Sequence, residues 1–372
     1  MGTLSDAQRT SLAARLRQGR TAAGTIPRRA PEVRELPLSF GQEQLWFIDQ
    51  FAPGLPVYNI ASALRLHGKL DAAALGRALD DLVARHEVLR SRLVNAQGRP
   101  LQVIDPPCAR RLVVENLSAY EAAARETRLR ELAKQEAASP FDLAAGPLFR
   151  ARLIRLSSEE HVLLVCAHHT VFDGWSFEVF IRELTVLYQA HATGQAASLP
   201  EMPVQFADYA LWERERLQGE LLQDLVDYWR TALDGLSTMQ MPTDRPRPLL
   251  QSFDGGFHKL NIDADVLDRL KLLSRQTGST LFVTLLSAVQ VLVHRYTGQD
   301  DIVVGTASAN RSRPELAPLI GYLVNTLPIR TDTSGDPTFV DLLRKVRTTT
   351  IEAYAHQDLP FARLVEALRV ER

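Results

Sequence analysis

The sequence lacks the features that mark secreted, metal-binding and membrane-spanning proteins. Its two cysteines, Cys108 and Cys166, provide neither a disulfide framework nor a zinc-binding spacing. No apolar run reaches the ~18 residues of a transmembrane helix, and the polar N-terminus does not resemble a signal peptide. A formal net charge of −1 gives no general attraction to nucleic acid. These absences predict a cytoplasmic protein that binds neither membranes nor nucleic acid.

The remaining composition is that of an ordinary globular protein, with 45% hydrophobic and 23% charged residues in a chain of 372. That length is sufficient for two domains of ordinary size. Residues 1–35 predict a short helix, at 5–17, followed by an exposed linker. The first lobe is expected over residues 36–193, and the second over residues 200–372, beyond a small, polar stretch with two prolines.

Hydrophobic patterns predict several elements that bear on the site. Residues 149–156 and 161–167 are two apolar segments joined by a polar turn, which is typical of an antiparallel strand pair. Residues 205–233 are expected to be a long, mostly helical stretch. Residues 257–262 are expected to form a strand in the second lobe.

The most informative stretch is VLLVCAHHTVFDGWS, at residues 162–176. Its apolar first half reads as a fully buried strand, because it is β-branched and too short for a stable helix. Two histidines, His168 and His169, end this strand. Asp173 and Gly174 then form a turn before an amphipathic helix. A rigid strand thus delivers two imidazoles to a reachable turn.

Three interpretations of His168 and His169 compete on the residues alone. Both rings can be structural groups at a strand end, which is the more frequent case for an arbitrary histidine pair. A metal site is disfavoured, because neighbouring strand residues point to opposite faces and no HExxH or paired CxxC motif supplies further ligands. In the third interpretation one histidine is catalytic and the other structural. Asp173 would then pair with an arginine, since a buried carboxylate needs a partner.

Six segments, in order along the chain, resemble the core motifs of nonribosomal peptide synthetase condensation domains, which are relatives of chloramphenicol acetyltransferase. A seventh motif, expected at or beyond Arg372, is absent. The chain is therefore expected to be a fragment that lacks the last strands of its second lobe. The six segments are LSFGQEQLWFIDQ (38–50), RHEVLRSRL (85–93), HHTVFDG (168–174), QFADYALWERE (205–215), IGYLVNTLPIR (320–330) and HQDLPF (356–361).

The resemblance implies an α/β (α+β) fold of two acetyltransferase-like lobes in a V with a central tunnel. Two phosphopantetheine arms would enter this tunnel from opposite faces, so no covalently bound cofactor is expected. The arms would belong to an upstream donor and a downstream acceptor peptidyl carrier protein, or to an acyl carrier protein as donor. An adenylation domain would lie adjacent.

The implied reaction is amide-bond formation, in which a carrier-bound amine attacks a carrier-bound acyl thioester. His169 is expected to act as the base, or to orient the amine. His168 is expected to brace the loop. Asp173 is assigned to a structural salt bridge, with Arg85 as the preferred partner and Arg311 as the alternative.

Other site residues follow from the same resemblance. Gly174 would let the backbone approach the thioester, and its amide would help hold the carbonyl oxygen. Phe172, Trp175 and Ser176 are expected to line the substrate tunnel. Asn325 is either a turn-forming amide or, by resemblance, a residue that shapes the cavity.

The subtype and the function class both leave alternatives open. The opening LSFGQEQLWFIDQFAPG and the Asp-Gly-Trp-Ser sequence resemble domains that join an L-configured donor to an L-configured acceptor. Phe172 stands where many of these have a small residue, so a starter or polyketide-hybrid donor stays open. The absence of a DxxxxD motif counts against heterocyclisation. The rival functions are a non-catalytic docking module, disfavoured by the intact HHTVFDG, and an acyltransferase that forms esters or loads a starter.

Overall fold

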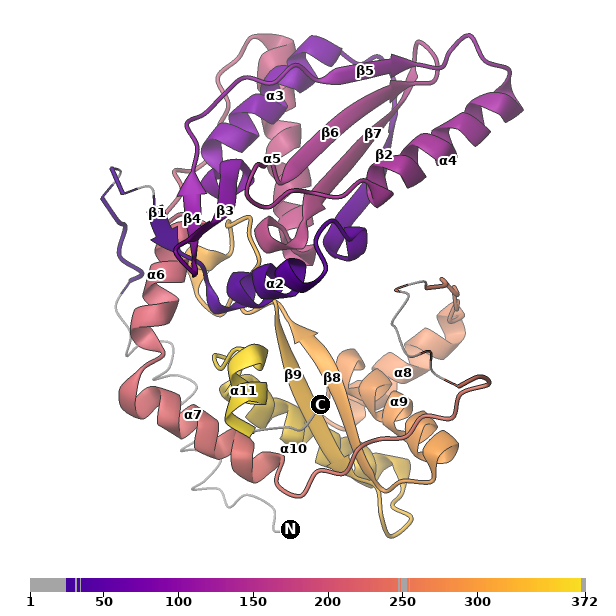
Figure 1. The fold of residues 1–372 in the computed structure, drawn as a ribbon. Helices are drawn as coiled ribbons and strands as arrows, with labels where there is room; N and C mark the ends of the chain where they lie inside the picture. Colours follow the sequence, from indigo (N-terminus) through magenta and orange to yellow (C-terminus); the bar gives the residue numbers. More distant parts are fainter. Residues whose placement is uncertain are drawn as a thin grey trace. The chain divides into compact units, whose positions relative to one another are not determined.

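The computed structural model divides the chain into two compact units (Figure 1). The first comprises residues 1–217 together with 311–324, and the second comprises residues 218–310 together with 325–372. The division therefore falls at Leu217 rather than between 193 and 200, and a later segment returns to the first unit. The predicted helix at 5–17 lies outside the described residues, which are 25–30, 32–33, 35–246, 248, 253 and 255–368.

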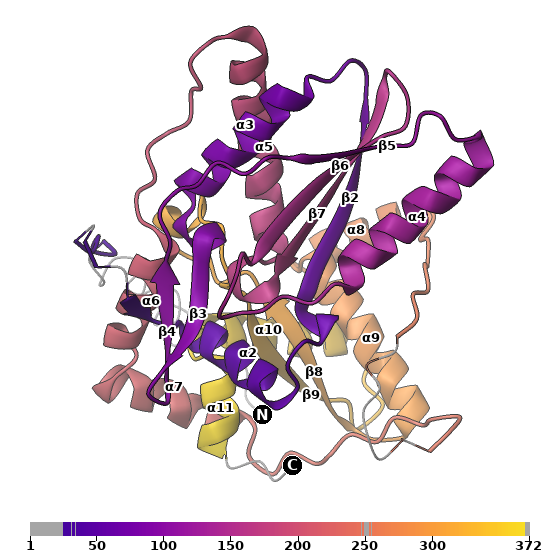
Figure 2. The ribbon, with the colours of Figure 1, turned by 45° about the horizontal axis from the view of Figure 1, so that its top comes forward.

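A four-stranded sheet forms the centre of the first unit, in the order β2-β7-β6-β5. β5 pairs with β6 in parallel, and the other neighbours are antiparallel. The antiparallel pairing of β6 with β7 confirms the predicted strand pair. Helices α3 and α5 cover one face and α4 covers the other (Figures 1 and 2). These elements are β2 (Asn59–His67), α3 (Ala72–Arg85), β5 (Val113–Asn116), α4 (Ala122–Ala138), β6 (Phe149–Arg155), β7 (Glu160–His168) and α5 (Gly174–Thr193).

β7 is buried on both of its faces, which explains its continuous apolar sequence. Leu163 and Val165 belong to the core beneath α3 and α5. Val162 and Leu164 belong to a separate core beneath α4. This alternation follows from the two-residue period of a strand, and it fixes the strand that carries the histidines firmly between two helical layers.

A second, three-stranded sheet and two helices complete the first unit. Ser39 caps α2 through the amide of Gln42, and the Gln42 side chain accepts from the Ser39 amide in return. This reciprocal pair is a capping box, as the Ser-x-x-Gln spacing predicts. The elements are β1 (Glu35–Pro37), α2 (Phe40–Phe51), β3 (Ser91–Ala96), β4 (Arg99–Ile104) and α6 (Phe206–Arg216), with short 3₁₀ turns η1 (Pro56–Tyr58), η2 (Glu87–Arg90), η3 (His169–Val171) and η4 (Pro314–Leu316).

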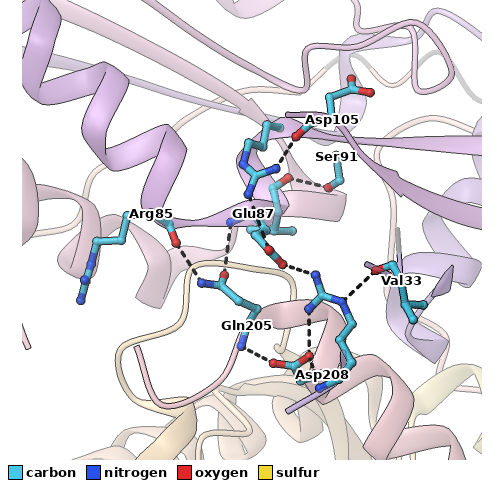
Figure 3. A network of polar contacts seen from close by, with 10 residues as sticks. Val33, Arg85, Glu87, Ser91, Asp105, Gln205 and Asp208 are labelled. Carbon is cyan, nitrogen blue, oxygen red and sulfur yellow. Dashed lines mark hydrogen bonds and ion pairs between the residues drawn. The ribbon is translucent and has the colours of Figure 1, made fainter. Parts of the chain in front are cut away.

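Most of the described residues before β1 are exposed, as expected of a linker, but Ile26 and Arg29 anchor this segment to the first unit. Ile26 is buried in the main core. The Arg29 guanidinium forms ion pairs with Glu87 and Asp208 (Figure 3). The same network joins Gln205 to the Arg85 carbonyl (Figure 3). A largely buried arginine needs such partners. These ion pairs link the segment before β1 to η2 and α6 within the first unit.

The second unit consists of a two-stranded antiparallel sheet and five helices among the described residues. The predicted helical stretch 205–233 is broken, because α6 ends at Arg216 in the first unit and α7 begins at Gly219. The predicted strand at 257–262 was wrong, since this exposed segment pairs with no strand among the described residues. The elements are α7 (Gly219–Ala232), α8 (Ala264–Gln276), α9 (Leu281–Thr297), β8 (Asp301–Ser308), β9 (Asn325–Asp332), α10 (Phe339–Ala355) and α11 (Phe361–Leu368).

No single helix in the described part of the chain is long and apolar enough to cross a membrane. Only α8 and α9 taken together reach that length and composition, and they are bent by 104° at the break between them.

Candidate active site

The histidine turn is built by two successive capping interactions. β7 ends at His168, whose side chain caps the 3₁₀ turn η3 through the amide of Thr170. Asp173 then caps α5 by accepting the amide of Ser176 at 2.8 Å. Both residue types are short-range acceptors, and Asp is among the preferred helix N-caps. The predicted strand, turn and helix are therefore confirmed, and the turn between them is held at each end.

His168 is the structural member of the histidine pair. Its side chain is buried, and its Nδ1 atom accepts the Thr170 amide at 3.3 Å and lies 2.9 Å from the Thr170 hydroxyl. Phe141 and Tyr58 make edge-to-face contacts with the ring. Burial, reinforced by neighbouring His169, lowers the pKa of His168 to about 4. A neutral imidazole with this packing braces the turn, and its low pKa makes it a weak base near neutral pH.

His169 has the opposite arrangement. Its Nδ1 atom lies 2.7 Å from the Phe172 carbonyl oxygen. Because a carbonyl only accepts, Nδ1 must carry the proton, which leaves the lone pair of the neutral ring on Nε2. Nε2 forms no hydrogen bond with any residue that the structure describes. The side chain is half-buried rather than sealed in packing. The ring therefore presents one oriented, unused acceptor.

Asp173 is fully engaged by groups of the first unit. Its Oδ1 atom accepts the Ser176 amide at 2.8 Å, the Ser176 hydroxyl at 2.7 Å and Arg311 Nη2 at 3.0 Å. Its Oδ2 atom accepts Arg311 Nη1 at 2.9 Å and the Leu323 amide at 3.1 Å. The side chains of Asp173 and Arg311 are 1% and 2% exposed. A carboxylate with five donors and a bidentate arginine is a structural anchor.

The prediction that Arg85 forms the salt bridge with Asp173 was wrong. Arg85 ends α3, and its Nε atom donates to Glu183 Oε2 at 2.9 Å while Nη2 donates to the Pro200 carbonyl at 2.6 Å. Glu183 lies ten residues after Asp173, about 15 Å further along α5. The end of α3 therefore meets α5 well away from the turn.

Glu183 has a second buried partner in His86, whose Nε2 atom lies 2.8 Å from Oε2. Burial alone would raise the pKa of Glu183, but His86 and Arg85 outweigh it and hold the pKa below its ordinary value. Arg85 thus stabilises the packing of α3 on α5.

The four residues around the turn differ in accessibility. Phe172 and Ser176 are buried in the first unit, at 1% and 0% exposure, so the prediction that their side chains line an open passage was wrong. Trp175 is 40% exposed, and its indole donates to the Ala317 carbonyl at 2.9 Å. Gly174 is exposed, and a Cβ atom added there would meet nothing within 4 Å. The solvent-exposed residues beside the turn are thus Gly174 and Trp175.

Asn325 is the first residue of β9 and belongs to the second unit. Its Nδ2 atom donates to the carbonyls of Gln357 and Leu359, both at 2.8 Å. Its Oδ1 atom accepts the amides of Thr326 and Phe361, both at 2.9 Å. All four hydrogen-bonding positions of the amide are therefore used. Asn325 joins the fifth and sixth sequence segments and is not a turn residue.

Contacts of two residues with the turn were not predicted from the sequence. Gln42 is fully buried, and its Nε2 atom donates to the Thr170 carbonyl at 3.1 Å, which ties α2 to the turn. The capping box already explained a glutamine at this position, so nothing in the sequence pointed to the longer-range bond to Thr170. Tyr322 places its ring 4.7 Å from that of His169, measured between centroids. The only signal for Tyr322 was an aromatic residue flanked by Gly321 in an otherwise apolar segment.

No group of three or more His, Cys, Asp or Glu side chains in the described ranges is arranged to hold a metal ion.

Comparison with known proteins assigns the family. The condensation domain model matches residues 32–372. One of the proteins that make up the linear gramicidin synthase of Brevibacillus parabrevis is 48% identical over 96% of this chain, which spans 5% of that relative. Among solved structures, the X-domain from teicoplanin biosynthesis is 32% identical, with a TM-score of 0.82 over 94% of this chain and 76% of its own. The first condensation domain of the calcium-dependent antibiotic synthetase, 24% identical, shares the fold with a TM-score of 0.76, covering 91% of this chain and 78% of its own.

The chain belongs to the condensation domain family, and its relatives are nonribosomal peptide synthetases. The prediction drawn from the six sequence segments is confirmed at this level. The mixed helix and sheet fold is likewise confirmed by the structural neighbours.

Proposed function

We propose that this domain forms an amide bond by attack of a carrier-bound aminoacyl amine on a carrier-bound donor acyl thioester. The family relationship supports the reaction class. The observation that carries the proposal is the free Nε2 atom of His169, oriented by the 2.7 Å bond between Nδ1 and the Phe172 carbonyl. An ammonium group is not a nucleophile, so the acceptor must lose a proton before or during attack.

The proposed reaction forms one bond, breaks one bond and moves one proton from the amine to the leaving thiolate through His169. The amine nitrogen forms a bond to the thioester carbon, and its proton passes to Nε2 of His169. Collapse of the tetrahedral intermediate breaks the carbon–sulfur bond, and the leaving thiolate takes a proton back from the imidazolium. His169 thus acts as base and then acid, or orients the amine, while the two tethered substrates are held together.

Gly174 has two roles in this proposal. The absence of a side chain leaves open space for the thioester, since a Cβ atom would meet no neighbour within 4 Å. Its peptide N–H, at the positive end of α5, would donate to the developing oxyanion. Trp175, the exposed residue that follows, is the proposed contact for the substrate chain.

The substrates imply the partners. Donor and acceptor would arrive on phosphopantetheine arms of an upstream and a downstream peptidyl carrier protein, with an acyl carrier protein as an alternative donor. An adjacent adenylation domain would load the acceptor carrier. The relationship to synthetases far longer than this chain supports these proposals.

A docking module is the second candidate, because one structural neighbour is the X-domain from teicoplanin biosynthesis, which also occurs in a complex with OxyB. The free Nε2 atom of His169 favours catalysis over this alternative. An acyltransferase that forms esters is the third candidate and would use the same histidine.

The test is a condensation assay with the protein and two loaded carrier proteins. The donor carries an acyl thioester, and the acceptor carries either an amino acid or the matched hydroxy acid. Mass spectrometry of the acceptor arm is expected to detect the amide, with little or no ester. Ester as the main product would support the third candidate. Carrier binding without any product would support the docking module and reject the proposed function.

A further inference from the structure

Tyr322 contacts the ring of His169 from a distant part of the sequence. The two ring centroids lie 4.7 Å apart with an interplanar angle of 75°, which is an edge-to-face arrangement. Tyr322 lies within 311–324, the segment that returns to the first unit. The role proposed above for His169 leaves this contact unexplained.

The backbone on both sides of Tyr322 is bound to the start of α5. The Gly321 amide donates to the Ser176 hydroxyl at 3.0 Å, and the Leu323 amide donates to Asp173 Oδ2 at 3.1 Å. Gly321 has a φ of 156°, and a Cβ atom there would lie 2.1 Å from the ring of Phe206. Asp173, which caps α5, and Ser176, in the first turn of α5, thus hold the backbone on either side of Tyr322 in place.

The Tyr322 ring also packs on bare backbone at Gly41, in the first turn of α2. A Cβ atom added to Gly41 would lie 2.7 Å from the ring of Tyr322, too close for any side chain without displacing the ring. Burial, with Tyr58 and Asp173 nearby, raises the pKa of Tyr322 to about 12. The ring is therefore neutral, and it contacts both α2 and the imidazole.

The hydrogen bond of His169 leaves its ring two possible motions, which the contact with Tyr322 restricts. The bond from Nδ1 to the Phe172 carbonyl fixes one atom of the ring, but the imidazole can still pivot about it or flip to another rotamer. A second contact on the ring restricts both motions. A base misplaced by about 1 Å loses about 100-fold in rate, so this restriction has a direct kinetic value.

We propose that Tyr322 is a positioning residue, whose ring keeps the His169 imidazole in the single orientation that presents Nε2 to the acceptor amine. This inference rests on the proposed function and deepens it. The contact is made by the ring and not by the hydroxyl group. Gly41 contributes by leaving the space that the ring occupies.

Three variants test this proposal in the condensation assay. Tyr322→Phe retains the ring and is expected to keep the wild-type kcat. Tyr322→Leu is expected to lower kcat by about 10- to 100-fold with an unchanged KM for the loaded acceptor carrier. Gly41→Ala, which pushes the ring without altering either partner, is expected to lower kcat by a smaller factor.

A spectroscopic reading separates positioning from a general structural role. Long-range proton–nitrogen NMR is expected to show one tautomer of His169, protonated on Nδ1, in wild type and Tyr322→Phe. Tyr322→Leu is expected to show a mixture of tautomers. Thermal melting measures the folded fraction, and if Tyr322→Leu does not fold, Gly41→Ala decides the matter by the same two readings.

Two results would overturn the proposal. One is a Tyr322→Leu variant with wild-type kcat and a single His169 tautomer. The other is a Tyr322→Phe variant as impaired as Tyr322→Leu, which would assign the effect to the hydroxyl. A wild-type protein that forms no amide rejects the proposed function instead, and the NMR reading still decides whether Tyr322 orients His169.

Discussion

The start of β9 at Asn325 in the second unit and the histidine turn in the first are built alike. Each joins segments far apart in the sequence through one buried polar side chain, Asn325 in one and Asp173 in the other. At Asn325 every donor and acceptor position is used within the unit. At the histidine turn both carboxylate oxygens of Asp173 are likewise engaged, whereas Nε2 of His169 has no hydrogen-bond partner among the described residues.

The difference separates structural from chemical groups. A buried polar group whose bonds are all made contributes to folding, since leaving any of them unmade costs about 1–3 kcal/mol. A reactive group needs the reverse, an oriented lone pair that the protein itself does not occupy. On this basis Asn325 and Asp173 are expected to affect stability, and His169 is expected to affect turnover. His168 is also expected to affect stability, because it is buried as a neutral ring.

The largest stability effect is expected from Arg311→Met. This change leaves the Asp173 carboxylate buried beside an uncharged side chain, which costs about 3–5 kcal/mol when one partner of a buried pair is removed. Arg85→Met is the matched control, because Arg85 pairs with Glu183 and is expected to destabilise the protein less. Urea unfolding gives the two values.

A double-mutant cycle sharpens this prediction. Combining Asp173→Asn with Arg311→Met is expected to show strong coupling, and combining it with Arg85→Met is expected to be additive. Coupling of Asp173 to Arg85 alone would contradict the assignment of the salt bridge.

The next effect is a pH dependence from His168. Its pKa is lowered to about 4 in the folded protein, against an ordinary value of 6.5. The unfolded chain therefore binds the proton first, and stability present above pH 6.5 is lost as the pH falls towards 4. The loss is about 3 kcal/mol for a shift of this size.

The measurement is the unfolding free energy of wild type minus that of His168→Asn, followed from pH 7 to pH 4. Subtraction removes the titration of the carboxylates that both proteins share. A difference that does not change over this range would show that His168 is not buried as a neutral ring.

A smaller effect, confined to turnover, is expected from Gly174→Ala. The new methyl group meets no protein atom within 4 Å, so the melting temperature is expected to stay at the wild-type value. The same methyl group obstructs the approaching thioester and is expected to lower turnover by about tenfold. Gly98→Ala, at an exposed turn with a φ of 86°, is the contrasting control, which should lower the melting temperature and leave turnover per folded molecule unchanged. Unchanged turnover in Gly174→Ala would contradict the proposed approach.

The smallest effect is expected from Trp175→Phe. The exposed indole loses its hydrogen bond to the Ala317 carbonyl, which is worth about 0.5–1.5 kcal/mol. Thermal melting measures the change, and a loss as large as that of Arg311→Met would show that the returning segment depends on Trp175 instead of on the buried salt bridge.

Local patterns were enough to predict the element that carries the site. The apolar run of β7, the two histidines and the Asp-Gly turn follow from side-chain periodicity and capping, both of which act within a few residues. These patterns did not decide which histidine is structural; the resemblance to the family assigned that role to His168. The capping box at Ser39 and Gln42 was also predictable, because it too depends on residues only three positions apart.

Long-range pairing was beyond the reach of these patterns. Arg85 and Arg311 are equally good partners for Asp173 by charge, and only the packing of α3 on α5 directs Arg85 to Glu183. Segment 257–262 contains the strand-favouring residues Phe257 and Ile262, but a strand also needs a neighbour, and none pairs with it in the described part of the chain. The Arg29 ion pairs likewise depend on residues from two distant segments.

The central claim is that the unused Nε2 atom of His169 assists the attacking amine. Its most direct test is the single-turnover rate of amide formation with both carriers loaded, measured for wild type and His169→Ala at equal folded fraction. We expect the variant to be slower by about 10²- to 10⁴-fold, with the melting temperature close to that of wild type. Equal rates for the two proteins would contradict the claim.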